Sequence, residues 1–229
     1  MLDAMTNPVF VAVDTPTLAG ARALVRAVAP HVGGVKLGLE FFCAEGPVGV
    51  AAIAALGLPV FLDLKLHDIP NTVAGALHSL GALAPAIVTV HAAGGHAMLA
   101  AARAAAPAAT RVVAVTVLTS LDDDDLAAIG VGDGSALQVA RLATLVRGAG
   151  LDGVVASPHE TAALRAAWPD AVLVIPGVRP EGSAAGDQKR VMTPQQARVA
   201  GASVLVIGRP ITAAIDPAAA AAAIARSLA

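Results

Sequence analysis

Eight short runs of β-favouring residues alternate with Ala-rich helical patterns along the chain. A regular alternation of strands and helices is typical of a parallel sheet covered by helices. Eight such units within 229 residues predict an α/β fold, a single-domain (β/α)8 TIM barrel over residues 1–229. The expected strands are residues 9–13, 35–37, 60–64, 87–91, 112–118, 153–156, 172–175 and 204–207.

The helical patterns between these runs carry start signals. Thr193-Pro194 and Asp216-Pro217 each place a capping side chain before a proline at the first helical position. An open, doubly wound sheet is the alternative, but no Gly-x-Gly-x-x-Gly follows the first strand. The expected helices are residues 17–29, 43–56, 72–83, 96–106, 135–148, 158–167, 194–200 and 217–228.

Composition argues against several classes of partner. A formal charge of −2, a pI near 6.3 and an aromatic content of 2% provide neither a basic stripe nor rings for base stacking, so we expect no nucleic acid. The longest uncharged stretch, residues 79–102, is broken by Pro85, Gly94 and Gly95, so we expect no membrane association. The N-terminus lacks a signal-peptide layout, and Cys43 is the single cysteine, which fits a cytoplasmic location.

The third strand contains charges that a buried strand ordinarily excludes. Asp63 and Lys65 interrupt the apolar run that starts at Val60, and Asp68 follows just before Pro70. Residues two apart leave the same face of a strand, and buried charges are costly without partners. One interpretation is a structural ion pair at a strand end. We favour the other, a catalytic charge array.

Other polar residues are expected at the same end of the barrel. Active sites of (β/α)8 barrels lie where the strands end. Asp14 follows the first strand, and Lys36 lies within the second. Because a closed barrel has no edge strand, an inward-facing Lys36 needs Asp14 or Asp63 as a neighbour. We therefore predict an alternating network of Lys36, Asp63, Lys65 and Asp68.

The last quarter of the chain carries signals for an anion. Loops after the seventh and eighth strands of such barrels commonly bind phosphate. Gly208 permits close approach of the backbone to a phosphate, and Arg209 offers a guanidinium. Taken alone, this pair fits a surface arginine beside a turn equally well. Residues 176–192 lack apolar periodicity and contain Arg179 and Gln188, and long irregular loops are often functional. We predict a mobile lid that closes on phosphate.

Several conspicuous residues are not expected to form sites. Four consecutive aspartates at 122–125 would fan out rather than converge on a metal, so they predict a solvated helix start that Ser120 could cap. The six histidines lack metal-ligand spacing, and His67 is interpreted as structural despite its position beside Lys65. Cys43 has no evident activating partner and is expected to serve packing. We therefore expect no metal site.

The segment from Asp63 to Thr72, Asp-Leu-Lys-Leu-His-Asp-Ile-Pro-Asn-Thr, resembles the signature of the orotidine 5′-monophosphate decarboxylase family. Its Asp-x-Lys-x-x-Asp core is shared with sister barrels, whereas the longer string with Ile-Pro-Asn-Thr is far more specific. Nearly the whole chain takes part in the resemblance. The further matches are Val13-Asp14, Val35-Lys36-Leu-Gly, Leu118-Thr-Ser120, Pro176-Gly-Val-Arg179-Pro, Gly186-Asp-Gln188 and Val206-Ile-Gly208-Arg209-Pro.

The resemblance implies decarboxylation of orotidine 5′-monophosphate to UMP and CO2, the last step of de novo pyrimidine nucleotide synthesis, with no metal or organic cofactor. Lys65 would protonate C6 of the pyrimidine as CO2 leaves. Asp63 would lie against the substrate carboxylate and hold Lys65. Lys36 and Asp14 would bind the ribose hydroxyls.

The resemblance also implies a homodimer with shared active sites. Asp68 and Thr72 would reach into the partner's site, and Ser120 would contact the pyrimidine. Binding of the phosphate would close the loop over the site. The remaining substrate-binding positions would be Pro176, Arg179, Gln188, Gly208 and Arg209.

Two alternatives stay open at the level of sequence. A magnesium-dependent sugar-phosphate decarboxylase or aldolase of the same superfamily would share Asp-x-Lys-x-x-Asp, but those enzymes carry an acidic metal ligand where this chain has Lys36. A non-catalytic barrel that senses nucleotides is the other alternative, because fold alone does not determine function.

Overall fold

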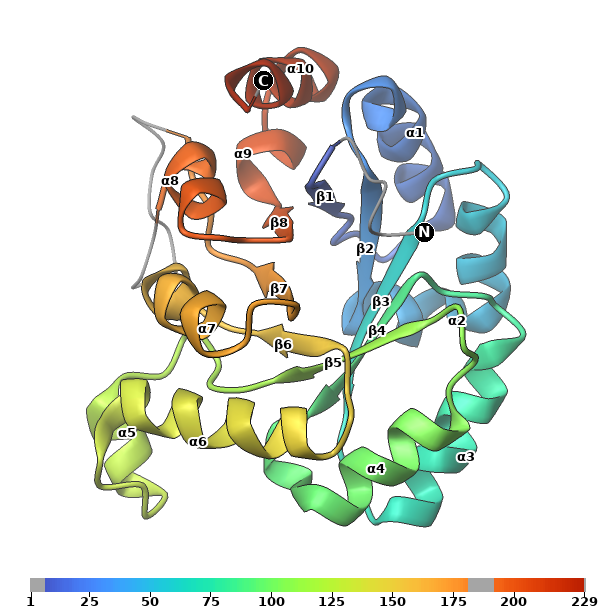
Figure 1. The fold of residues 1–229 in the computed structure, drawn as a ribbon. Helices are drawn as coiled ribbons and strands as arrows, with labels where there is room; N and C mark the ends of the chain where they lie inside the picture. Colours follow the sequence, from blue (N-terminus) through green and yellow to red (C-terminus); the bar gives the residue numbers. More distant parts are fainter. Residues whose placement is uncertain (1–6, 181–191, 229) are drawn as a thin grey trace.

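The structure is a computed structural model that describes residues 7–180 and 192–228. Eight parallel strands follow one another in sequence order around a closed barrel, and β1 pairs with β8 to complete it. The helices form an outer ring around the strands (Figure 1). The predicted (β/α)8 barrel is confirmed. The strands are β1 (Val9–Ala12), β2 (Gly34–Gly38), β3 (Val60–Leu66), β4 (Ile87–His91), β5 (Arg111–Val115), β6 (Gly153–Val155), β7 (Val172–Ile175) and β8 (Val204–Ile207).

The helices largely follow the expected pattern. Short 3-10 turns, η2 (Ala29–His31), η3 (Ala92–Gly94) and η4 (Pro158–Glu160), flank α1, α4 and α7. None of the helices in the described residues has the length and apolar character needed to cross a membrane. The α-helices are α1 (Leu18–Val28), α2 (Leu39–Ala54), α3 (Pro70–Gly81), α4 (Gly95–Ala105), α5 (Asp123–Ala128), α6 (Gly134–Gly148), α7 (Thr161–Ala167), α8 (Pro194–Val199), α9 (Arg209–Thr212) and α10 (Pro217–Ser227).

Most element boundaries shift by one or two residues from the prediction, and larger differences occur at α2, β5 and α9. The helix expected from residue 43 begins at Leu39 and is kinked at Gly46 (φ 59°, ψ −164°), directly before Pro47. This conformation is open to glycine, and proline removes a helical donor, so the two residues mark the kink. The strand expected to reach residue 118 ends at Val115. Helix α9, which begins at Arg209, was not predicted.

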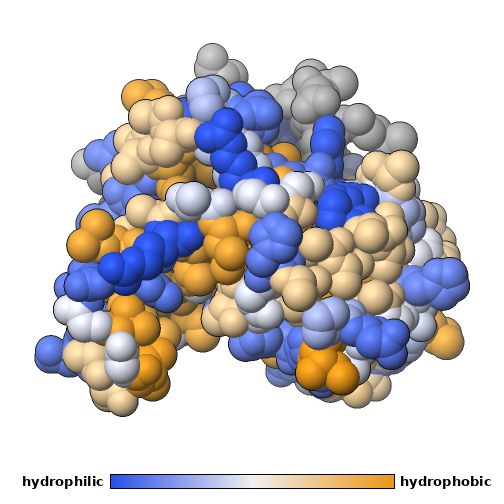
Figure 2. Space-filling model, turned by 60° about the horizontal axis from the view of Figure 1, so that its bottom comes forward, coloured by the Kyte–Doolittle hydropathy of each residue, from blue (hydrophilic) through white to orange (hydrophobic). Residues whose placement is uncertain are grey.

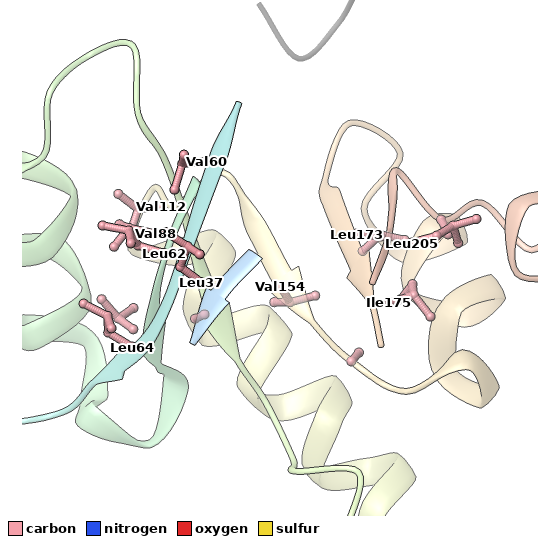
Figure 3. Packing of buried hydrophobic residues seen from close by; sticks show 14 of the residues in the cluster. Leu37, Val60, Leu62, Leu64, Val88, Val112, Val154, Leu173, Ile175 and Leu205 are labelled. Carbon is pink, nitrogen blue, oxygen red and sulfur yellow. The ribbon is translucent and has the colours of Figure 1, made fainter. Parts of the chain in front are cut away.

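Alternate strand residues pack on opposite sides of the barrel wall. In β8, Val204 and Val206 belong to a small cluster inside the barrel, whereas Leu205 and Ile207 belong to the larger cluster beneath the helices. Leu205 and other members of the larger cluster are drawn in Figure 3. This alternation follows from the two-residue period of a strand. The residues inside the barrel are Phe10, Ala12, Phe61, Ile87, Val113, Val174, Val204 and Val206.

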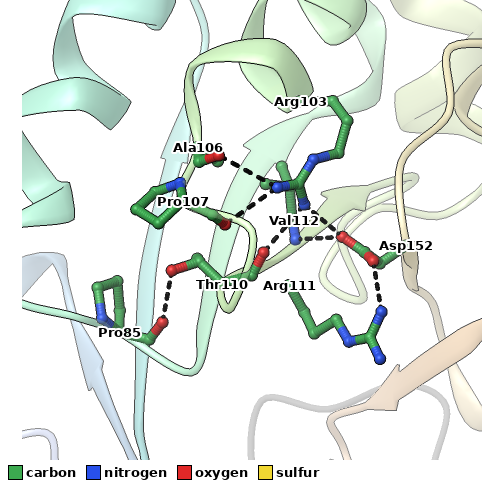
Figure 4. Close-up of polar contacts among 8 residues, drawn as sticks. All are labelled: Pro85, Arg103, Ala106, Pro107, Thr110, Arg111, Val112 and Asp152. Carbon is green, nitrogen blue, oxygen red and sulfur yellow. Dashed lines mark hydrogen bonds and ion pairs between the residues drawn. The ribbon is translucent and has the colours of Figure 1, made fainter.

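The N-terminal end of the barrel is held by a partly buried polar cluster around Asp152 (Figure 4). The Asp152 carboxylate accepts hydrogen bonds from Arg103 Nη1 at 2.7 Å and from Arg111 Nη1 at 2.9 Å. Nearby, the Thr110 hydroxyl donates to the Pro85 carbonyl at 2.9 Å. These contacts tie α4 to the starts of β5 and β6, at the end of the barrel where conservation in such folds serves stability rather than catalysis.

The exterior mixes polar and apolar side chains, which are interspersed over the face seen in Figure 2. Scattered apolar residues are normal on protein surfaces. One exposed apolar residue stands out by its location, because Ile69 is 66% exposed immediately after Asp68 in the segment that leads from β3 to α3.

Candidate active site

Charged residues at the C-terminal ends of the first three strands form one continuous chain of ion pairs. Asp14 Oδ1 lies 3.2 Å from Lys36 Nζ, and Lys36 Nζ lies 3.7 Å from Asp63 Oδ2. Lys65 Nζ donates to both oxygens of Asp63, at 2.9 and 2.8 Å. The signs alternate along the chain, so each charge faces an opposite one. From the sequence, Asp14 or Asp63 was expected beside Lys36, and both carboxylates lie there.

Strand alternation explains why these side chains meet. Phe61 faces the interior of the barrel, and Asp63 has the same parity in β3. Leu62 and Leu64 point instead to the helices, as Figure 3 shows. In β2, Val35 and Leu37 belong to the outer cluster, which turns Lys36 inward. Lys36 is 9% exposed, so its ammonium depends on Asp14 and Asp63 for compensation.

The path of β3 differs from the plain pleat assumed in the sequence analysis. Lys65 has a φ of 51°, in the left-handed region, and the pairing of β3 with β4 shifts register between Leu62 and Leu66. Left-handed backbone costs a non-glycine residue about 1–2 kcal/mol. From the sequence, Asp63 and Lys65 were expected on one face of a regular strand. In the structure they meet instead through this local irregularity in β3.

Thr89 of β4 is a site residue that the sequence analysis missed. Its side chain is fully buried, and its hydroxyl donates to Asp63 Oδ1 at 3.0 Å. The Thr89 hydroxyl oxygen itself accepts a hydrogen bond from the Lys65 backbone N–H at 2.9 Å. The available signal was its position, two residues after the inward-facing Ile87 in a strand that is otherwise apolar except at its last residue, His91.

The site borders a cavity of about 140 Å³ at the C-terminal ends of the strands. Lys36, Asp63 and Lys65 line one part of it, and Pro176 lines another. Ser120 is exposed in the turn after β5 and is absent from the lining, which Leu118 and Thr119 reach instead. Apolar side chains from β5 to β8 complete the wall, so the cavity has one charged side and one apolar side.

Asp68 and Thr72 lie apart from this network. Both are exposed, and Asp68 Oδ1 accepts a hydrogen bond from the Ile69 backbone N–H at 2.6 Å. Thr72 lies in the first turn of α3. Of the predicted four-residue network, the single chain contains Lys36, Asp63 and Lys65, and Asp14 joins them. Asp68 is exposed beside the exposed Ile69 and takes no part in these ion pairs.

The predicted phosphate-binding residues are only partly described. Arg179 is 8% exposed, and its Nη1 donates to the Val178 carbonyl at 3.1 Å. Gly208 precedes α9, and Arg209 is the exposed first residue of that helix. Gln188 and most of the predicted lid lie outside the described residues.

Two histidines stack beside Lys65. The rings of His67 and His91 have centroids 5.2 Å apart and planes inclined by 13°. His91 Nδ1 accepts a hydrogen bond from the Ala93 backbone N–H at 3.3 Å. Burial lowers the pKa of His91, and the nearby His67 and Lys65 lower it further. His91 thus favours its neutral form.

Two minor predictions need correction. Asp122, not Ser120, caps α5, because the Asp122 side chain accepts from Asp125 N and the Asp125 side chain accepts from Asp122 N. The aspartates otherwise form the helix start that was expected. Cys43 is exposed on α2 rather than packed in the core. Within the described residues, no group of three or more His, Cys, Asp or Glu side chains is arranged to hold a metal ion.

The chain is similar to known proteins over nearly its whole length. The chain is 59% identical over 224 residues to a protein from Novosphingobium aromaticivorans named orotidine 5′-phosphate decarboxylase, covering 98% of this chain and 100% of that protein. It is 60% identical over 213 residues to a protein of the same name from Sphingopyxis alaskensis, covering 93% and 95% of the two chains.

A solved structure has the same fold. The crystal structure of orotidine 5′-phosphate decarboxylase from Lactobacillus acidophilus superposes with a TM-score of 0.85 at 37% identity, covering 97% of this chain and 99% of that one. Residues 7–224 match the sequence model described as "Orotidine 5'-phosphate decarboxylase / HUMPS family". With its closed barrel and its chain of alternating charges at the strand ends, this enzyme belongs to that family.

Proposed function

We propose that this chain decarboxylates orotidine 5′-monophosphate to UMP and CO2, the last step of de novo pyrimidine nucleotide synthesis. The observation that carries the proposal is the alternating chain Asp14, Lys36, Asp63 and Lys65 on the wall of a cavity at the strand ends. Relatives at 59–60% identity over nearly the whole chain bear the name of this activity.

The reaction requires a proton donor beside C6 of the pyrimidine. The bond between C6 and the carboxyl carbon breaks, CO2 leaves, and the electron pair stays on C6. The Lys65 ammonium stabilises the developing negative charge and transfers a proton to C6, and solvent then reprotonates the amine. Asp63 accepts from Lys65 Nζ at 2.8 and 2.9 Å, which supports a role in aiming that ammonium.

The other charges of the chain bind the ribose in this proposal. Lys36 is held between Asp14 and Asp63, so its ammonium can donate to a hydroxyl without being left unpaired. Asp14 is exposed, with its side chain 58% accessible, and can accept from a second hydroxyl. The apolar part of the cavity, which includes Pro176, suits the flat pyrimidine.

The phosphate would bind at the ends of β7 and β8, through Arg179, Gln188, Gly208 and Arg209. Binding of this remote group would stabilise the closed site and orient the base. In this way the non-reacting part of a substrate can raise the rate of the chemical step. Ser120, close in sequence to the cavity-lining Thr119, would approach the pyrimidine on closure.

The proposal includes a homodimer in the cytoplasm with shared active sites. Asp68 and Thr72 are exposed and lie outside their own chain's ion-pair network, which supports a role in a partner's site. The adjacent Ile69 is 66% exposed, and a partner surface would cover its apolar side chain.

A spectrophotometric assay of purified protein with orotidine 5′-monophosphate tests the proposal, because loss of the carboxyl changes the ultraviolet absorbance of the pyrimidine. We expect conversion to UMP at the same rate with and without excess EDTA. A protein that binds UMP but does not turn over the substrate would instead be a nucleotide sensor.

The chelator arm addresses the magnesium-dependent alternative within the same superfamily. A divalent ion near β2 would meet the Lys36 ammonium, which already neutralises Asp14 and Asp63. Loss of activity in EDTA that Mg²⁺ restores would contradict the metal-free mechanism.

A further inference from the structure

We propose that Thr89 is a positioning residue whose single hydroxyl sets both the backbone of Lys65 and the carboxylate of Asp63. The inference rests on the proposed function for its kinetic consequence, but its geometric part concerns the protein alone. Thr89 lies in β4, on the neighbouring strand, and its side chain has no exposed surface. It therefore acts through Asp63 and Lys65 rather than on a ligand.

The two hydrogen bonds of the hydroxyl fix its direction. Thr89 Oγ1 accepts from the Lys65 backbone N–H at 2.9 Å. A hydroxyl has one proton, and here it is directed to Asp63 Oδ1 at 3.0 Å. Thr89 thus joins the backbone of the proposed proton donor to the side chain that holds its ammonium.

The bond to Lys65 compensates for a break in the sheet. Lys65 lies where the pairing between β3 and β4 shifts register, and its φ of 51° is strained for a lysine. A backbone N–H in a partly buried strand needs an acceptor. The Thr89 hydroxyl supplies one in place of a β4 carbonyl, and it thereby stabilises the left-handed conformation that directs the Lys65 side chain back to Asp63.

The bond to Asp63 constrains the carboxylate plane. Oδ1 accepts from Thr89 and from Lys65 Nζ, while Oδ2 faces both Lys65 Nζ at 2.8 Å and Lys36 Nζ at 3.7 Å. Without the Thr89 donor, only the two lysine side chains hold the carboxylate, so its orientation and the position of the Lys65 ammonium are less well defined. Misplacement of a reacting group by about 1 Å can cost roughly 100-fold in rate.

The experiment compares Thr89→Val, which has nearly the same shape but no hydroxyl, with Thr89→Ser, which keeps the hydroxyl. We expect Thr89→Val to lower kcat by about 10–100-fold while the Kd for UMP changes less than about threefold. Thr89→Ser should keep kcat within about fivefold of wild type. The matched control is Thr110→Val, which removes an equally buried hydroxyl at the opposite end of the barrel and should leave kcat within about twofold.

Three results would overturn the positioning role. One is a kcat for Thr89→Val within twofold of wild type. Another is a loss of UMP affinity in Thr89→Val by the same factor as the loss of kcat, which would indicate general disruption of the site. The third is an equal loss of kcat in Thr89→Ser. Should Thr89→Val fail to fold, Thr89→Cys decides by the same criteria, because a thiol is only a weak donor and acceptor.

Failure of the proposed function is recognised separately, by wild-type protein that does not turn over orotidine 5′-monophosphate. In that case a crystal structure of Thr89→Val tests the geometric part. Movement of Lys65 out of the left-handed region, away from its φ of 51°, supports the role, and an unchanged Lys65–Asp63 geometry overturns it.

Discussion

At the level of single residues, the proposed chemistry depends most on the ammonium of Lys65. Lys65→Ala removes both the proton donor and the charge that stabilises the carbanion. Each of these effects is commonly worth at least about 100-fold, so we expect kcat to fall by roughly 10⁴-fold or more. The Kd for UMP, which lacks the carboxyl, should stay within about tenfold. Stopped assays with concentrated enzyme, paired with calorimetric titration of UMP, measure both quantities.

Lys65→Arg separates charge from proton transfer. Arginine keeps the positive charge next to Asp63 but gives up its proton much less readily, and its planar head differs from a compact ammonium. We expect it to remain below about 1% of wild-type kcat. Near-normal turnover in either variant would remove Lys65 from the proton-transfer step.

His91 provides a pH-dependent prediction at the same scale. Its pKa in the folded protein is lowered from the model-peptide value of 6.5, first by burial and then by electrostatic repulsion from His67 and Lys65. The unfolded chain therefore binds more protons at this site, so the free energy of unfolding rises with pH and falls as the pH drops through about 6.5. His91→Gln should lose less stability than wild type between pH 7.5 and 5.5, measured by urea unfolding.

An equal change at an exposed position controls for the substitution itself. His78→Gln lies on the surface of α3 and makes a suitable comparison. If His91→Gln and wild type lost the same stability over this pH range, the stacked pair would not contribute to acid sensitivity.

At the scale of secondary structure, the strands were predictable because a short apolar run between two helical patterns is typical of a buried parallel strand. The break in β3 was not, because the left-handed Lys65 depends on a hydroxyl from β4 rather than on its own neighbours. Helix α9 escaped prediction for a related reason. It spans only four residues, Arg209 to Thr212, too few for a helical period to be visible.

Close strand packing gives a second kind of prediction. A Cβ at Gly153 in β6 would lie 2.1 Å from the Val172 carbonyl oxygen of β7. Backbone atoms cannot move aside as a side-chain end can, so Gly153→Ala should destabilise the protein by about 3 kcal/mol. Gly148→Ala is the matched control, because nothing lies within 4 Å of its Cβ at the end of α6. Urea unfolding should find the control unchanged or slightly more stable.

At the scale of the whole molecule, some site residues could be predicted from the sequence and the barrel fold, and others could not. Lys36, Asp63 and Lys65 were foreseeable because inward positions on adjacent parallel strands converge at one end of a barrel. Asp68 was grouped with them because it follows the third strand, and Thr72 was added from a family resemblance; both are exposed in the single chain. In the proposed homodimer a partner subunit would bring them to the substrate, and strand periodicity within one chain carries no signal for such a contact.

Mixing two inactive variants tests that assembly. In a symmetric dimer with shared sites, a Lys65→Ala subunit paired with an Asp68→Ala subunit has one site with both mutations and one with neither. Random pairing of equal amounts makes half of the dimers hybrids, so about a quarter of all sites regain activity. The measurement is kcat per site after subunit exchange, verified with a mass-tagged subunit. Proven exchange without recovered activity would mean that Asp68 serves its own chain, and its exposed position beside Ile69 would then need another explanation.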